Sequence, residues 1–256
     1  MDRKYVTCSM EKAIAIVSLN HQPANSLTQE MIKEIGTLFD ELALDDNVKV
    51  VVLLGEGRFF AAGADIKEFT KVTESKVFQN MSRTGQLVFN KIEAFTKPVI
   101  SVIHGAALGG GLELAMATHI RFVAENAKLG LPELQLGLIP GFGGTYRLQK
   151  LVGSRALELI LTSNPISGVE AVELGLANRA FPEDVLLEES MKVANILAKK
   201  GKESVARTLD LFLQSREGSL EDILEKEAVT FGEMAVTENA KEGISAFMEK
   251  RKPNFK

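Results

Sequence analysis

The sequence is poor in cysteine and has no long hydrophobic run. Its single cysteine, Cys8, cannot form an internal disulfide and has no thiol neighbour with which to build a metal site, so we expect a reducing compartment. No stretch reaches the roughly 18 uninterrupted apolar residues that a membrane-spanning helix needs. The amino terminus turns charged within a few residues and lacks the apolar centre of a secretory signal. These absences predict a cytoplasmic protein without a membrane partner.

Excess positive charge is also missing. The chain carries 30 basic and 34 acidic residues, which gives a formal charge of -4. Such a balance provides no general attraction for a phosphate backbone, so we expect no nucleic-acid partner. The basic tract at residues 199–202 is too short to change this expectation. A noncatalytic RNA-binding or scaffold protein is therefore only the alternative to an enzyme.

The residues that are abundant predict one large α/β core. Of 256 residues, 45% are hydrophobic and 25% are charged, as in ordinary globular proteins. Apolar runs typical of strands covered on both faces occupy residues 48–54 and 98–104, and a β-branched run occupies residues 13–19. Residues 74–95 repeat apolar side chains at helical spacing between two of these runs. This order predicts parallel strands joined by a crossover helix.

Two helix starts can be proposed from capping signals. Ser26 and Gln29 have the spacing of a capping box, before an apolar stripe that begins at Met31. Ser167 and Glu170 have the same spacing, with a glycine stop at residue 175. Residues 120–124 add one more short strand between these two regions.

The last part of the chain differs from the rest. Residues 183–256 contain helical stripes and no convincing strand. We therefore expect a main unit at residues 1–182 and a helical region at residues 183–256. A small helical region with several apolar faces cannot bury them all against itself, so we expect it to dock on the main unit or on another subunit.

Three glycine-dense clusters follow apolar segments, at residues 60–65, 108–113 and 139–145. Glycine and alanine at such places let a ligand approach main-chain N–H groups, and a helix that begins there adds its partial positive charge. Each cluster alone is equally consistent with a tight turn. None has the spacing of a dinucleotide or phosphate-loop motif, so a nucleotide cofactor is not indicated.

Two glutamates lie in unusually apolar surroundings. Glu113 falls in the first turn of the helix that the second cluster opens, and Glu133 lies in the apolar stretch at residues 129–134. Burial would favour the neutral carboxyl and raise its pKa, so the pair could divide acid and base duties. Local context alone also fits a helix-dipole partner or a solvated loop charge. The three histidines show no metal spacing, and we expect no metal site.

Several ordered motifs resemble those of the crotonase (enoyl-CoA hydratase/isomerase) superfamily, over nearly the whole length. They are NHQPANSL at residues 20–27, FFAAGADIKEF at 59–69, KPVISVIHGAALGGGLELAMA at 97–117, LPELQLGLIPGFGGTYRL at 131–148 and FMEKRKPNF at 247–255. The resemblance implies a spiral of ββα units with a helical carboxy-terminal region that assembles homotrimers, or homohexamers made of two trimers. The first of these motifs looks shorter here than in mitochondrial short-chain hydratases.

The resemblance also implies a catalytic site. In such enzymes two main-chain N–H groups hold the thioester oxygen, and the matching residues here are Ala64 and Gly110. Glu113 would activate the attacking water and Glu133 would supply the α-proton, with the two acting as a coupled pair. The Gly141 amide would also contact the water.

The expected substrate is an acyl-CoA thioester, and no separate cofactor is implied. The resemblance assigns CoA contacts to six residues, which are Ala24, Ala62, Asp65, Ile66, Phe247 and Lys250. Both motif glutamates are present, as hydration of a short- or medium-chain trans-2-enoyl-CoA to 3-hydroxyacyl-CoA requires. Another acyl-CoA reaction of the same fold, such as double-bond isomerisation, is the alternative.

Overall fold

The fold is a mixed α/β architecture built on two sheets, seen in a computed structural model that describes residues 3–216 and 218–255. The larger sheet has the strand order β1-β2-β3-β5-β7-β10, and the smaller one has the order β4-β6-β8-β9. The elements in chain order are β1 (Val6–Glu11), β2 (Ile14–Leu19), α1 (Gln29–Leu44), β3 (Val50–Gly55), β4 (Phe59–Ala61), α2 (Ile66–Phe69), α3 (Ser75–Glu93), β5 (Val99–Ile103), β6 (Ala106–Leu108), α4 (Gly110–Ala117), β7 (Ile120–Ala124), β8 (Lys128–Gly130), the 3-10 helix η1 (Glu133–Leu136), α5 (Gly144–Val152), α6 (Arg155–Thr162), β9 (Ile166–Ser167), α7 (Gly168–Glu173), β10 (Arg179–Phe181), α8 (Glu183–Leu197), α9 (Lys202–Gln214), α10 (Leu220–Ala235) and α11 (Glu238–Met248).

A ββα unit recurs along the chain. In β3-β4-α3, β5-β6-α4 and β7-β8-α5, the first strand joins the larger sheet, the second joins the smaller sheet, and a helix follows. The strands β3, β5 and β7 pair in parallel, as do β4, β6 and β8. This repetition confirms the expected α/β class and its ββα units.

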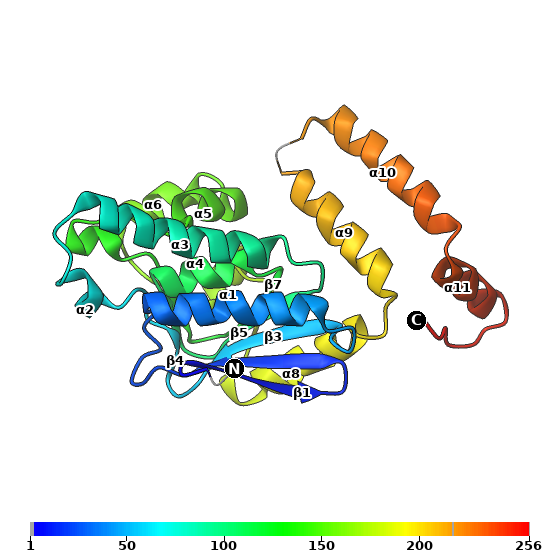
Figure 1. The fold of residues 1–256 in the computed structure, drawn as a ribbon, viewed down its shortest axis with the longest axis horizontal. Helices are drawn as coiled ribbons and strands as arrows, with labels where there is room; N and C mark the ends of the chain where they lie inside the picture. The colour runs from blue at the N-terminus through cyan, green and yellow to red at the C-terminus, as the bar shows by residue number, and fades with distance from the viewer. Residues whose placement is uncertain (1–2, 217, 256) are drawn as a thin grey trace.

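The core lies on both faces of the larger sheet. Every residue of β5 is buried, because helices cover the sheet on both sides. Figure 1 shows α1 and α3 on one side of the sheet and α8 on the other, and α8 contacts β3, β5, β7 and β10. The apolar runs therefore fold as the buried parallel strands that the sequence predicts.

The start of α1 corrects one expectation. Thr28, rather than Ser26, is the N-cap residue, and its side chain accepts a hydrogen bond from the Met31 N–H. The Ser26 carbonyl instead accepts a hydrogen bond from His21 Nδ1 over 2.7 Å. The predicted capping box at Ser167 and Glu170 is present.

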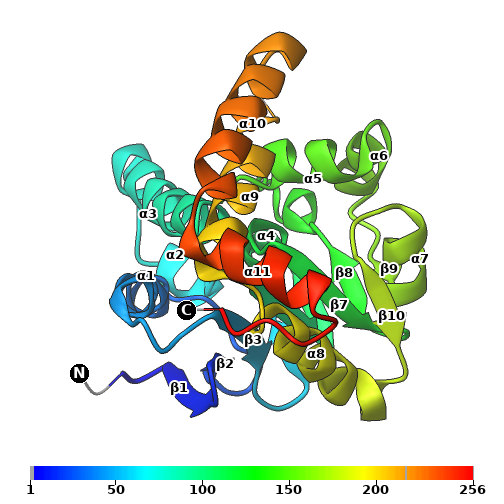
Figure 2. The same cartoon turned by 90° about the vertical axis from the view of Figure 1, so that its right-hand side faces the viewer.

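The helices of residues 183–255 do not behave as one unit. The first, α8, packs on the larger sheet, whereas α9 and α10 have no buried residue. Figures 1 and 2 show α9 and α10 side by side as a hairpin that extends away from the sheets, with α11 beyond it. No strand occurs in the described part of this region. A division of the chain at residue 183 remains a prediction.

None of the helices within the described ranges combines the length and hydrophobicity needed to cross a bilayer.

Candidate active site

The site lies where three strands of the smaller sheet end. Because β4, β6 and β8 are parallel and adjacent, their carboxyl ends meet at one edge. The loops after them contain residues 62–65, residue 109 and residues 131–143, which are the glycine-dense segments of the sequence and the stretch that carries Glu133. The repeated ββα unit thus brings together segments that are far apart along the chain.

Glu113 is held on α4, a helix whose residues are all buried. Only 1% of its surface is exposed. Its Oε1 accepts hydrogen bonds from the Phe142 N–H and the Gly144 N–H, each over 2.7 Å. These two donors come from the loop that enters α5, and they fix the orientation of the carboxylate.

Glu133 begins the short helix η1 and is half-buried. Its Oε2 is shielded from solvent and has no hydrogen-bond partner among the described residues. Its Oε1 lies 3.0 Å from the position that a Cβ on Gly109 would occupy. A buried carboxylate oxygen without a protein partner is unusual, and it leaves an acceptor or a proton free for a ligand.

Both carboxyl groups hold their protons more tightly than glutamate normally does. Burial, assisted by the nearby charge of Glu133, raises the pKa of Glu113 to about 7, against the opposing effect of the two backbone N–H groups and Arg147. Burial also raises the pKa of Glu133. Because each group disfavours a second negative charge nearby, the two titrate as a pair.

Two backbone amides, those of Ala64 and Gly110, lie close together at the ends of β4 and β6. Ala64 bridges Leu27 through the Gly63 carbonyl and the Asp65 N–H, which leaves the Ala64 N–H on the opposite side of the backbone. Gly110 is the first residue of α4, where an N–H has no partner within the helix. The Ala64 nitrogen lies 3.4 Å from the position of a Gly110 Cβ, and the Gly110 nitrogen lies 3.5 Å from that of a Gly63 Cβ. The two donors therefore line the same small space.

Gly141 lies on the loop that also supplies the donors to Glu113. Its carbonyl accepts hydrogen bonds from Ser82 Oγ over 2.6 Å and from Gln86 Nε2 over 2.9 Å. A Cβ at this position would meet only Ser82 Oγ, at 3.8 Å. The Gly141 carbonyl thus attaches the loop to α3, and the side of Gly141 that faces away from α3 is open.

Four of the six residues expected to contact CoA lie near one another. The Ala62 N–H donates to the Ala24 carbonyl over 3.0 Å, Asp65 caps α2 through the Lys67 N–H, and Ile66 is exposed at the start of α2. Phe247 and Lys250 lie elsewhere, at the end of α11 and just after it. Figure 1 places α11 and α2 at opposite ends of the molecule.

Sequence reasoning found both glutamates but missed the groups that orient them. The Phe142 and Gly144 amides belong to the third glycine-dense cluster, but nothing in the sequence paired them with Glu113, and Arg147, whose side chain is 4% exposed, was not singled out. One signal was present, because four polar residues recur at intervals of three and four along α3. These are Ser82, Gln86, Asn90 and Glu93.

Comparison with known proteins shows the family of the chain. The chain is 47% identical to a probable enoyl-CoA hydratase of Bacillus subtilis (strain 168) over 253 residues, which is 98% of each chain. It is 38% identical to a crotonyl-CoA hydratase of Syntrophomonas wolfei over 248 residues, covering 96% of this chain and 95% of that protein. The crystal structure of an enoyl-CoA hydratase from Bacillus anthracis superimposes with a TM-score of 0.95, at 35% identity and over 99% of both chains.

The family profile described as enoyl-CoA hydratase/isomerase matches residues 9–256, which span both sheets, the two glutamates and the carboxy-terminal helices. The chain belongs to the enoyl-CoA hydratase/isomerase family.

Proposed function

We propose that this protein is an enoyl-CoA hydratase, which adds water across the trans-2 double bond of a short- or medium-chain enoyl-CoA to give 3-hydroxyacyl-CoA. The observation that carries the proposal is the pair of buried carboxyl groups, Glu113 and Glu133, with raised pKa values beside two free backbone amides. Relatives named enoyl-CoA hydratase and crotonyl-CoA hydratase support the same reaction.

The chemistry assigns a role to each group. Attack of water on the β-carbon moves charge to the thioester oxygen, where an enolate develops. The N–H groups of Ala64 and Gly110 would hold that oxygen, and loss of one such donor typically costs about 10²- to 10³-fold in rate. Gly110 is well placed because the first turn of α4 adds partial positive charge.

The two proton transfers fall to the glutamates. Glu113, oriented by the Phe142 and Gly144 amides, would take a proton from the attacking water, and the Gly141 amide would contact the same water. Glu133 would deliver a proton to the α-carbon from its unpartnered Oε2. The OH group added to the β-carbon and the proton added to the α-carbon together make up one water molecule. The reaction therefore needs no oxidant, reductant or separate cofactor.

The CoA part of the substrate would run along Ala24, Ala62, Asp65 and Ile66. Phe247 and Lys250 lie at and just after the end of α11, at the opposite end of the molecule from α2 (Figure 1). They are therefore too far from that site to complete it in the same chain. We propose that they contact the CoA of a neighbouring subunit.

We further propose a homotrimer, or a homohexamer of two trimers. Support comes from the large apolar side chains that α9, α10 and α11 expose, which include Phe212, Phe231, Ile244 and Phe247. The exposed free thiol of Cys8 fits a reducing compartment such as the cytoplasm.

A crotonyl-CoA assay with product identification tests the function. We expect loss of the conjugated thioester absorbance and formation of 3-hydroxybutyryl-CoA. A second substrate, a trans-3-enoyl-CoA, detects isomerisation. Isomerised product without any 3-hydroxy product would replace hydration by the isomerase reaction, and no turnover of either thioester would refute both.

A further inference from the structure

A polar stripe on α3 runs along the back of the loop that serves Glu113. It consists of Ser82, Gln86, Asn90 and Glu93, which share one face of the helix because their spacings are four, four and three residues. Ser82 and Gln86 bind the Gly141 carbonyl. Asn90 and Glu93 bind Arg147 of α5. All four members of the stripe therefore contact residues 141–147.

Arg147 is the centre of this arrangement. Its Nη1 donates to the Phe142 carbonyl over 2.9 Å, Nε donates to Glu93 Oε2 over 2.9 Å, and Nη2 donates to Asn90 Oδ1 over 2.6 Å. The planar guanidinium thus meets three acceptors at fixed angles, which an ammonium group cannot reproduce. Gly143, at φ 104°, leaves the necessary room, because a Cβ there would lie 2.4 Å from Arg147 Nη1.

Phe142 connects Arg147 to Glu113. The Phe142 carbonyl accepts from Arg147, and the Phe142 N–H donates to Glu113 Oε1 over 2.7 Å. The aromatic ring of Phe142 packs against Phe89 of α3 at a centroid distance of 5.5 Å. A shift of Arg147 would consequently move an N–H donor at the catalytic carboxylate.

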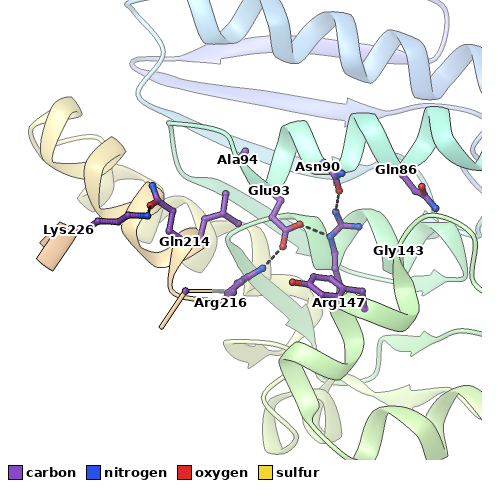
Figure 3. Close-up of a pocket in the computed structure, with 12 residues that line it drawn as sticks. Gln86, Asn90, Glu93, Ala94, Gly143, Arg147, Gln214, Arg216 and Lys226 are labelled. Atoms are coloured by element: carbon purple, nitrogen blue, oxygen red, sulfur yellow. Dashed lines mark hydrogen bonds and ion pairs between the residues drawn. The ribbon is translucent and has the colours of Figure 1, made fainter. Parts of the chain in front are cut away.

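Glu93 extends the arrangement to the carboxy-terminal helices. Its second oxygen pairs with Arg216, which follows the end of α9, and Figure 3 shows Glu93 between the two arginines. The Arg216 carbonyl also accepts from Lys150 of α5 over 2.9 Å. Glu93, Arg147 and Arg216 border a cavity of about 770 Å³ between α3, α5 and the start of the α9–α10 hairpin. Arg216 therefore joins the α9–α10 hairpin to Glu93, which holds Arg147 behind the Phe142 loop.

We propose that Arg147 and Glu93 are positioning residues for Glu113, and that Arg216 makes their arrangement depend on how the α9–α10 hairpin docks. The inference rests on the proposed function for its kinetic consequence, since Glu113 must be the water-activating base. Its structural part, the dependence of the Phe142 loop on Arg216, holds whatever the reaction.

The size of the effect follows from the burial of the pair. The side chains of Arg147 and Glu93 are 4% and 13% exposed, so screening by water is weak. Removal of one partner from such a pair leaves an uncompensated buried charge, and the surrounding structure must move to rehydrate or re-pair it. Misplacement of a catalytic group by about 1 Å can cost on the order of 10²-fold in rate.

The first experiment compares Arg216→Ala with Arg207→Ala in the full-length protein. Arg207 is a matched control, because it lies on α9, the helix that Arg216 follows, and pairs with Glu233 of α10 rather than with Glu93. We expect Arg216→Ala to lower kcat for crotonyl-CoA by about 10-fold with little change in KM, since the loop orients the base rather than the CoA. Arg207→Ala should leave both constants unchanged. Equal kcat for the two variants, or a change confined to KM, would overturn the proposal.

The second experiment does not depend on activity. Amide hydrogen exchange of a peptide that spans residues 140–146 should become faster in Arg216→Ala, and also in Arg147→Lys and Glu93→Gln, but not in Arg207→Ala. Light scattering of each variant establishes whether the assembly is intact. Unchanged exchange in all three variants would refute the coupling even if the wild type proves inactive. Absence of hydration by the wild type, with the exchange result as expected, would refute only the proposed function.

Discussion

The carboxylate of Glu133 lies directly over Gly109, so that a Cβ on residue 109 would fall 3.0 Å from Glu133 Oε1. Gly109 has φ 51° and ψ -128°, a conformation that residues with a side chain rarely adopt. The same glycine thus shapes the backbone at the start of α4 and leaves space for the catalytic carboxyl group.

Replacement of Gly109 by alanine should therefore damage both stability and activity. Gly153 offers a matched control, with φ 60°, ψ -135° and open space around the position of a Cβ. Both variants should lose about 1–3 kcal/mol of unfolding free energy through backbone strain. Only Gly109→Ala should also lower kcat, by at least about 10-fold, because it displaces Glu133. Thermal unfolding and the crotonyl-CoA assay measure the two effects, and equal kcat values would contradict the assigned role of Glu133.

Glu133→Gln should remove the proton donor with little change of shape. We expect kcat to fall by about 10²- to 10⁴-fold, the usual contribution of an acid or base group, while KM stays near the wild-type value. Glu125→Gln, at an exposed glutamate just after β7, is the control and should turn over normally. A folded Glu133→Gln variant with wild-type kcat would exclude Glu133 from the proton transfers.

The raised pKa values predict a bell-shaped pH dependence of kcat/KM. The active form carries one proton on the Glu113 and Glu133 pair, one group acting as base and the other as acid. At high pH the pair loses its last proton, and at low pH both groups are protonated. The acid limb of the profile should lie at a higher pH than the ordinary pKa of glutamate, because burial raises the pKa of both carboxyl groups. A profile that stays flat from pH 5 to pH 9 would show that the pair does not share one proton.

Glu113 should also make the protein less stable as pH rises. Its pKa is 4.5 in an unperturbed state and about 7 in the fold, so the folded state binds its proton more tightly than the unfolded state. The corresponding stabilisation is fully present below pH 4.5 and disappears as pH rises through 7, a change of roughly 3 kcal/mol. Glu113→Gln keeps an uncharged acceptor and should exceed the wild type in stability at pH 8 but not at pH 4. Urea unfolding at the two pH values checks this, and a constant difference would contradict it.

The apolar surface of α10 predicts a change of assembly when it becomes charged. Phe231 is 74% exposed in the single chain. If this surface is buried between subunits, Phe231→Lys should reduce the particle to a monomer, whereas Glu225→Lys on the same helix should leave its size unchanged. Light scattering distinguishes the two, and an intact assembly in Phe231→Lys would place the interface elsewhere.

The parts of the fold that sequence could predict are those with a strong local signal. The buried runs became β3 and β5, the helical stripe between them became α3, and the capping box at Ser167 started α7. The hydrophobic pattern alone did not indicate the smaller sheet, because its strands have only two or three residues each and no hydrophobic period can be read from so few. Thr28 rather than Ser26 is the N-cap residue because Leu27 is still extended, with its N–H and carbonyl paired to Gly63 and Asp65.

The candidate site was predictable where a residue type is chemically distinctive. Carboxylates in apolar segments drew attention to Glu113 and Glu133, and the glycine-dense clusters indicated backbone donors. The sequence did not show that the Phe142 amide, in the third cluster, donates to Glu113. The bonds from Ser82 and Gln86 to Gly141 join residues more than 50 positions apart, and such long-range pairing follows from the packing of α3 on the loop rather than from local pattern. The position of α11 relative to α2 is likewise a property of the whole fold.

The ends of β4, β6 and β8 each deliver one part of the site, so that three successive repeats must stack before the site is complete. A fragment that ends after α4 would contain Ala64, Gly110 and Glu113 yet have neither the second acid nor the amides that orient the first. Partial folding can therefore produce no partially competent enzyme. Chemical competence and completion of the smaller sheet should appear together as the chain folds.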